Sequence, residues 1–151
     1  MSSAQILRYL IIAMWATALL GVVLDFSLDS QLPETLRDYR AAEWDSDFTA
    51  RDGLGAVAGL VVIWYMVRGS IQLYRLRFAG RRTFLIGVVL GALTMPVYGP
   101  DVYHGWTSLF NEASTTLGGV IVGWLYLSDI QLQLKDAASA EGPSHRPPPI
   151  S

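Results

Sequence analysis

The chain of 151 residues contains no cysteine and only two histidines. The lack of cysteine excludes a thiol-disulfide enzyme, whose chemistry requires a reactive thiolate. His104 and His145 both fall outside the apolar runs, so the axial ligands that a haem-carrying bundle needs inside its helices are missing as well. The sequence also offers no serine, histidine and acid set that could meet within one site. We therefore expect no enzymatic activity and no cofactor.

Acidic residues are absent from the first apolar segment, where residues 9 to 24 contain none. A proton-coupled multidrug transporter of the small four-helix type is expected to carry a glutamate at this place, inside the membrane. The apolar runs also hold no cluster of carboxylates. This class of transporter is therefore excluded too.

Apolar residues, in contrast, are abundant. Hydrophobic residues make up 52% of the chain, and the mean hydropathy is +0.34. They form four blocks, each near the length of a helix that crosses a hydrocarbon core of about 30 Å at about 1.5 Å per residue. The sequence predicts an all-α integral membrane protein with four transmembrane helices, over residues 6–26, 53–74, 83–98 and 113–130.

These blocks form one predicted transmembrane domain, residues 1–136. The first block could instead be a signal peptide, but no small-x-small cleavage pattern follows it, which favours a retained anchor. Residues 137–151, "AASAEGPSHRPPPIS", show no apolar periodicity and contain three consecutive prolines. We expect this segment to be a disordered cytoplasmic tail.

Charged residues are distributed unevenly among the segments that connect the blocks. If both termini face the cytoplasm, eight of the eleven Lys and Arg residues lie inside, and ten of the thirteen acidic residues lie outside. This distribution is the positive-inside pattern. We therefore expect a multi-pass protein of a bacterial cytoplasmic membrane, with both termini in the cytoplasm.

The densest group of basic residues is "RLRFAGRR", residues 75–82, between the second and third blocks. Arg68 lies inside the second block, from which its long side chain can reach the same membrane surface. Guanidinium groups bind phosphates, so a nucleic acid or another anionic ligand is one alternative. A cytoplasmic loop between two spans is expected to be basic for reasons of topology alone. We therefore favour contacts with anionic lipid headgroups or a membrane-protein partner. The candidate contact residues are Arg68, Arg75, Arg77, Arg81 and Arg82.

The first outer loop, residues 27–52, is long enough to have structure of its own. In "SQLPETLRDYRAAEW", Pro33 suits the first turn of a helix, and apolar residues recur on one face. This pattern predicts a short amphipathic helix on the outer membrane surface. The following "TARD" matches a capping box, in which Thr49 and Asp52 satisfy the free amides at the start of a helix.

Three of the predicted spans contain a G-x-x-x-G motif. The spacing by four places both glycines on one helix face, where another helix can approach closely. The partner can be a helix of the same chain or of a second subunit in a homo-oligomer, and we favour packing within the chain. The candidate packing residues are Gly55, Gly59, Gly87, Gly91, Gly119 and Gly123.

The stretch "MPVYGPDVYHGW", residues 95–106, separates the last two blocks. Pro96 cannot donate a backbone hydrogen bond, so the third helix should kink or end there. Asp101 and His104 are three residues apart and could share a proton or hold a metal weakly, but a selective metal site needs three or four ligands. We favour a structural role, with Asp101 as a helix N-cap and His104 solvated, and expect no metal.

Three segments together resemble a group of small, four-span bacterial inner-membrane proteins of uncharacterised function. They are "LYRLRFAGRRTFL", "YGPDVYHGW" and "LGGVIVGWLYLSDI", within residues 53–131. The group shows an arginine-rich turn before the third span, then a Gly-Pro turn, then a glycine-bearing last span. The resemblance implies location and architecture, and it carries no activity.

Two functions remain for such a protein. The first is a non-enzymatic role in which helix packing and loop contacts bind membrane partners. The alternative is a small pore or transport subunit that works as an oligomer and needs a polar lining. The polar groups available for a lining gather near the outer ends of the spans, which favours the first function: Thr94, Asn111, Ser114, Thr115 and Thr116.

Overall fold

The structure is a computed structural model, and it describes residues 2–44, 49–98 and 103–130. Every regular element within these residues is a helix, so the predicted all-α fold is confirmed. The predicted tail, residues 137–151, lies outside the described residues. The elements in chain order are α1 (Ser3–Leu28), the 3-10 helix η1 (Asp29–Gln31), α2 (Glu34–Trp44), α3 (Ala50–Tyr74), α4 (Ala79–Tyr98) and α5 (Gly105–Leu127).

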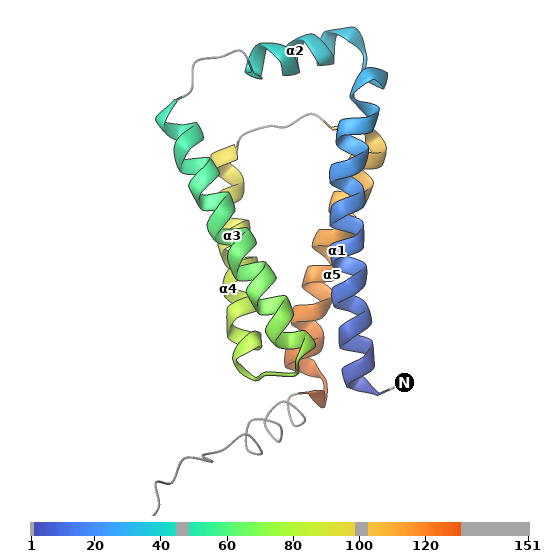
Figure 1. Ribbon diagram of the computed structural model, residues 1–151, viewed down its shortest axis with the longest axis vertical. Coiled ribbons are helices and arrows are strands. Elements are labelled where there is room, and N and C mark those ends of the chain that lie inside the picture. Colours follow the sequence, from blue (N-terminus) through green and yellow to red (C-terminus); the bar gives the residue numbers. More distant parts are fainter. Residues whose placement is uncertain (1, 45–48, 99–102, 131–151) are drawn as a thin grey trace, which may run out of the picture.

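The four long helices form two antiparallel pairs, α1 with α5 and α3 with α4 (Figure 1). Helices pack closely within each pair, whereas few contacts join one pair to the other. The pairs converge at the end that carries the α3–α4 turn, and they diverge toward the end where α2 lies (Figure 1). We call the first the basic end, after the arginines of residues 75–82, and the second the acidic end, after the carboxylates on and beside α2.

Glycines allow the backbones of α3 and α4 to lie very close together. A Cβ atom added to Gly69 would lie 2.7 Å from both Cα and N of Phe84, and one added to Gly80 would lie 2.7 Å from the Leu73 nitrogen. On Gly87 the added atom would lie 2.9 Å from Sδ of Met66. Carbon atoms in good contact are about 3.5 to 4.0 Å apart, so a Cβ at Gly69 or Gly80 would collide with backbone, and one at Gly87 would require Met66 to shift.

The hydrophobic core lies at the basic end. Its members come from the first half of α1, the end of α3, the start of α4, and the end of α5 with the residues just after it, so all four long helices meet there. Phe84 is fully buried among them. Together with Phe84, the core consists of Leu7, Ile11, Met14, Leu73, Ile121, Leu125 and Ile130.

A tight turn joins α3 to α4. Leu76 has a φ of 56°, a left-handed conformation that is uncommon outside glycine. Its N–H donates to the carbonyl of Leu73 at 2.9 Å, and the N–H of Arg77 donates to that of Gln72 at 2.8 Å. These two bonds form a Schellman motif, which satisfies carbonyls that the helix end leaves free. The motif reverses the chain within four residues, so α4 returns directly along α3.

Two of the local sequence predictions are confirmed. The capping box is present, because Thr49 N donates to Asp52 Oδ2 at 2.8 Å and Thr49 Oγ1 accepts from Asp52 N at 3.3 Å. The loop between the first two long helices contains the predicted short helix, α2. The carbonyl of Pro33 accepts hydrogen bonds from the N–H groups of Leu36 and Arg37 at its start. In Figure 1, α2 crosses the acidic end at a steep angle to α1.

The fourth long helix begins earlier than predicted. The apolar run predicts a start at Ala113, whereas α5 begins at Gly105. Its first two turns carry Ser108, Asn111 and Glu112, and these polar residues hid the start of the helix from a search for apolar runs. The third helix ends at Tyr98, with Pro96 in its last turn.

Two stretches of the described chain are long and apolar enough to cross a membrane, Ser3–Gln31 and Ala50–Tyr74. Helices α4 and α5 fall short of the same criterion. The first turn of α4 carries Arg81 and Arg82, and α5 begins with the polar turns described above. Four spans therefore remain a prediction.

Candidate functional site

Two arginine–tyrosine contacts join the helix pairs at the basic end. The guanidinium of Arg8 on α1 lies 5.2 Å from the ring centre of Tyr74 on α3, and its Nε donates to the Tyr74 carbonyl at 3.1 Å. The guanidinium of Arg81 on α4 lies 3.7 Å from the ring centre of Tyr126 on α5. Cations within about 6 Å of an aromatic face are attracted to it. Arg81, a predicted lipid or partner contact, is thus half-buried in a contact between the pairs.

The other four candidate arginines lie on the surface. The guanidinium of Arg68 lies 4.8 Å from the ring centre of Trp64, one helical turn away on α3. Arg75, Arg77 and Arg82 are exposed around the α3–α4 turn. These positions leave their charges accessible to an anionic group outside the protein.

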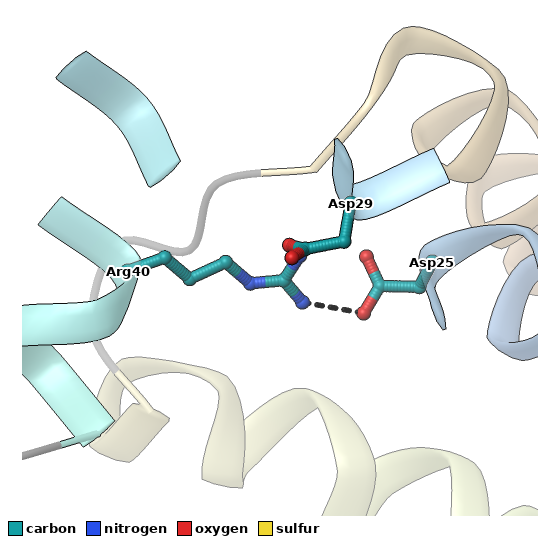
Figure 2. A network of polar contacts seen from close by, with 3 residues as sticks. All are labelled: Asp25, Asp29 and Arg40. Carbon is teal, nitrogen blue, oxygen red and sulfur yellow. Dashed lines mark hydrogen bonds and ion pairs between the residues drawn. The ribbon is translucent and has the colours of Figure 1, made fainter. Parts of the chain in front are cut away.

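A network of charged residues holds α2 against the end of α1 (Figure 2). Arg40 of α2 contacts Asp25 of α1 at 2.5 Å and Asp29 of η1 at 2.9 Å. The side chains of Arg40 and Asp25 are each 18% exposed, and that of Asp29 is 48% exposed. One guanidinium therefore bridges two carboxylates, and charge-assisted hydrogen bonds of this kind are stronger than neutral ones.

Sequence reasoning missed this network. Arg40 is 15 residues from Asp25 and 11 from Asp29, and only the reversal of the chain through η1 brings the three together. One signal was available, since Asp25 is an acid at the end of a long apolar run. Such a group needs a partner when it is partly buried.

A cavity of about 440 Å³ lies between the two helix pairs. It begins at mid-height, beside Trp15 and Met66, and extends toward the acidic end, where Met95 lines it. The core closes it toward the basic end, and a hydrogen bond of 3.0 Å from Trp15 Nε1 to Ser70 Oγ joins the pairs beside it. Its lining is almost entirely apolar. Cavities of about 300 to 1,000 Å³ with such a lining are typical ligand sites between the helices of a bundle.

The polar residues near the cavity are already hydrogen-bonded inside the protein. Ser114 Oγ donates to the Met14 carbonyl at 3.1 Å, and Thr115 Oγ1 donates to the Asn111 carbonyl at 3.0 Å. Thr94 Oγ1 donates to the Gly91 carbonyl at 3.0 Å. These hydroxyls do not form the continuous polar path that an ion pore needs.

The glycine motifs have different surroundings. Gly87 lies against Met66 of α3, and a Cβ on Gly91 would lie at an ordinary 3.5 Å from Val62. Gly119 and Gly123 face open space within this chain, since an added Cβ would meet nothing within 4 Å. The expectation of packing within the chain therefore does not apply to these two, because α5 turns the neighbouring Gly118 toward α1.

In the first of the motifs, Gly55 is buried and Gly59 half-buried on α3. Gly21 is a close-packing glycine that belongs to none of the predicted pairs. A Cβ there would lie 2.5 Å from Oδ1 of Asn111 on α5.

His104, half of the predicted outer-turn site, is the N-cap of α5. Its Nδ1 accepts from the backbone N–H of Trp106 at 3.4 Å. The sequence predicts Asp101 as the cap and a solvated His104. Because α5 begins at Gly105, His104 occupies the capping position and is half-buried. Asp101 lies outside the described residues.

These observations define an all-helical protein with two strongly apolar helices, an apolar cavity between helix pairs and a cationic end. Within the described residues, no group of three or more histidines and acids could hold a metal ion. No family model matches the chain, and comparisons with curated proteins and with solved structures find no match either.

The network at the acidic end leads to a first prediction. Replacing Arg40 with Gln removes the charge that bridges two carboxylates, so α2 should detach from α1 more readily, by about 1 to 3 kcal/mol in local opening free energy. Hydrogen–deuterium exchange should rise over residues 34–42. Arg37→Gln is the matched control, because Arg37 is exposed on the same helix. Equal exchange in both variants would show that the network does not hold α2.

Proposed function

We propose that the protein is a non-enzymatic integral membrane protein with four spans, which acts through helix packing and loop contacts with lipids and membrane-protein partners. The observation that carries the proposal is the exposure of its apolar helices. The most apolar windows of Ser3–Gln31 and Ala50–Tyr74 are only 22% and 17% buried. The core helix of a soluble protein would be mostly buried, so these surfaces require an apolar solvent.

The pairing of helices supports four spans rather than two. If α3 crosses the membrane, α4 packs along it in the opposite direction and has to cross as well. For the same reason, α5 has to cross the membrane if α1 does. With 20 and 23 residues, α4 and α5 are long enough for a hydrocarbon core of about 30 Å at about 1.5 Å per residue.

The charge distribution supports an orientation with both termini in the cytoplasm. The basic end carries the exposed arginines Arg75, Arg77 and Arg82, and positive residues favour the cytoplasmic side. The acidic end and α2 then face outward, where α2 lies along the membrane surface. The resemblance to small bacterial inner-membrane proteins supports the cytoplasmic membrane as the location.

The basic end supports the contact role. Arg75, Arg77 and Arg82 lie in or beside the α3–α4 turn, and a basic cluster beside a membrane attracts anionic headgroups. A pore subunit, the alternative, is less well supported. Its candidate lining residues Thr94, Ser114 and Thr115 donate their hydroxyls to carbonyls within the chain.

Single cysteines test the topology cleanly, because the chain has none of its own. Thr35→Cys on α2 and Gly105→Cys at the start of α5 should react with a membrane-impermeant maleimide in intact cells. Ala79→Cys at the start of α4 should react only after the membrane is opened. All three residues are exposed, so differences in labelling report the side of the membrane. Labelling of Gly105→Cys together with Ala79→Cys, only in opened cells, would mean two spans instead of four.

The contact role is tested by removing charge from the turn. A triple variant with Gln at Arg75, Arg77 and Arg82 should lose preference for phosphatidylglycerol over phosphatidylcholine, by about 1 kcal/mol per arginine at most. Electron paramagnetic resonance of spin-labelled lipids around the reconstituted protein measures this preference. The control has Lys at the same positions and should keep it. Unchanged selectivity in the Gln variant would argue against a lipid contact at this end.

A further inference from the structure

The cavity between the helix pairs is a site that the proposed function does not use. We propose that it binds one acyl chain of a phospholipid, which enters from the acidic end. This proposal rests on the proposed insertion of the protein into a membrane, because the lipid is drawn from the bilayer.

The size of the cavity selects the kind of occupant. An apolar cavity of about 150 Å³ holds a molecule the size of benzene. The volume of about 440 Å³ is about three times as large, which suits one hydrocarbon chain. A spanning helix is about 10 Å wide and rises about 5.4 Å per turn, so the same space would hold only about one turn of it. A partner helix is therefore excluded as an occupant of the cavity.

The lining selects a flexible apolar ligand. Met14, Met66 and Met95 line the cavity on three different helices. Methionine side chains are unbranched and polarisable, so they adapt to the shape of a mobile chain. The hydroxyls of Ser114 and Thr115 already donate to backbone carbonyls, which leaves the lining without a free donor for a polar ligand.

The surroundings of the cavity, which is partly open, favour entry from the acidic end. The core and the Trp15–Ser70 hydrogen bond close it toward the basic end. It continues toward the acidic end as far as Met95, three residues before the end of α4. A chain that enters from there places its headgroup beside α2, where acidic residues outnumber basic ones. The headgroup should therefore carry no net negative charge, which favours phosphatidylethanolamine over phosphatidylglycerol.

Two adjacent glycines provide a matched pair of variants. Gly118 lines the cavity, and a Cβ there would meet only Met14 Sδ, at an ordinary 3.8 Å. Gly119 faces the outside, with nothing within 4 Å of an added Cβ. Leucine at either position makes the same chemical change on the same helix. Only Gly118→Leu fills the cavity.

The experiment uses the full chain reconstituted in vesicles of equal parts phosphatidylethanolamine and phosphatidylglycerol. In separate samples, one of the two lipids carries a photoactivatable diazirine in its acyl chain. After irradiation, peptide mapping should find crosslinks at cavity methionines, mainly from phosphatidylethanolamine. Because leucine displaces several methylene-sized groups, Gly118→Leu should lower these crosslinks about tenfold or more. Gly119→Leu should leave them unchanged.

Ala92→Leu is a second filling variant, from the opposite helix pair, in case Gly118→Leu fails to fold. Thermal melting shows whether each variant is folded. Equal crosslinking of the cavity in the filled and control variants would overturn the proposal, and so would its absence in the unmodified protein. A preference for phosphatidylglycerol would overturn the entry of the chain from the acidic end.

The same crosslinking experiment also shows whether the protein is in the membrane at all. The outward-facing residues Val120 and Leu127 are exposed and would be crosslinked by any surrounding bilayer. If they are labelled and the cavity is not, the protein is in the membrane and the acyl-chain site is wrong. If neither is labelled, the membrane assignment is wrong, and the acyl-chain site is wrong with it.

Discussion

The close approach of α3 and α4 is the constraint on which the rest of the structure depends. At Gly69 and Gly80 an added methyl group would collide with the backbone of the neighbouring helix, and at Gly87 it would press on Met66. Such contacts keep two helix backbones close together along much of their length, and the many small dispersion interactions between them add up. In a membrane they matter more than in water, because lipid tails supply no hydrophobic drive for helices to associate.

Several features follow from this pairing. Phe84 lies directly opposite Gly69, so the contact fixes the place of the largest fully buried side chain. The core forms around it, and the pairs meet through arginine–tyrosine contacts on either side. Beyond the core the pairs diverge and leave the apolar cavity. The basic turn and the cavity thus lie on opposite sides of one core, so the two proposed lipid contacts are separate from each other.

At the acidic end, α2 is held in place by ion pairs and not by close helix packing. Arg40 reaches from α2 to Asp25 and Asp29 (Figure 2), and α2 is thereby held across the acidic end (Figure 1). Water and salt screen exposed ion pairs, but two of these three side chains are mostly buried. The position of α2 therefore depends on a few polar contacts. This is the part of the protein that should open most easily.

The sequence predicted what depends on nearby residues. The all-helical fold, the helix in the first loop and the capping box at Thr49 follow from composition, periodicity and short motifs, and all are present. The start of α5 was misplaced, because a search for apolar runs cannot detect helical turns that carry Asn111 and Glu112. The sequence also did not show which way each helix is rotated about its own axis. Spacing by four identifies a face, but only the packed structure shows that Gly87 meets α3 while Gly119 meets nothing.

The cavity and the charged network could not be predicted from the sequence. Both are made by residues from distant segments, and both depend on the angle between the helix pairs. The arginines illustrate the difference. Arg75 and Arg82 lie on the surface, as a basic cluster beside a membrane predicts, whereas Arg81 contacts Tyr126, 45 positions away in the sequence.

The most direct test of the account is the substitution Gly69→Ala, with Gly119→Ala as its control. Alanine favours a helix over glycine by about 0.5 to 1 kcal/mol, so Gly119→Ala should leave the melting temperature unchanged or raise it. At Gly69 the added methyl would lie 2.7 Å from the Phe84 backbone, and overpacking of this kind costs about 1 to 3 kcal/mol. The account predicts a clear fall in the melting temperature of Gly69→Ala in detergent or in bilayers. A melting temperature equal to that of Gly119→Ala would contradict it.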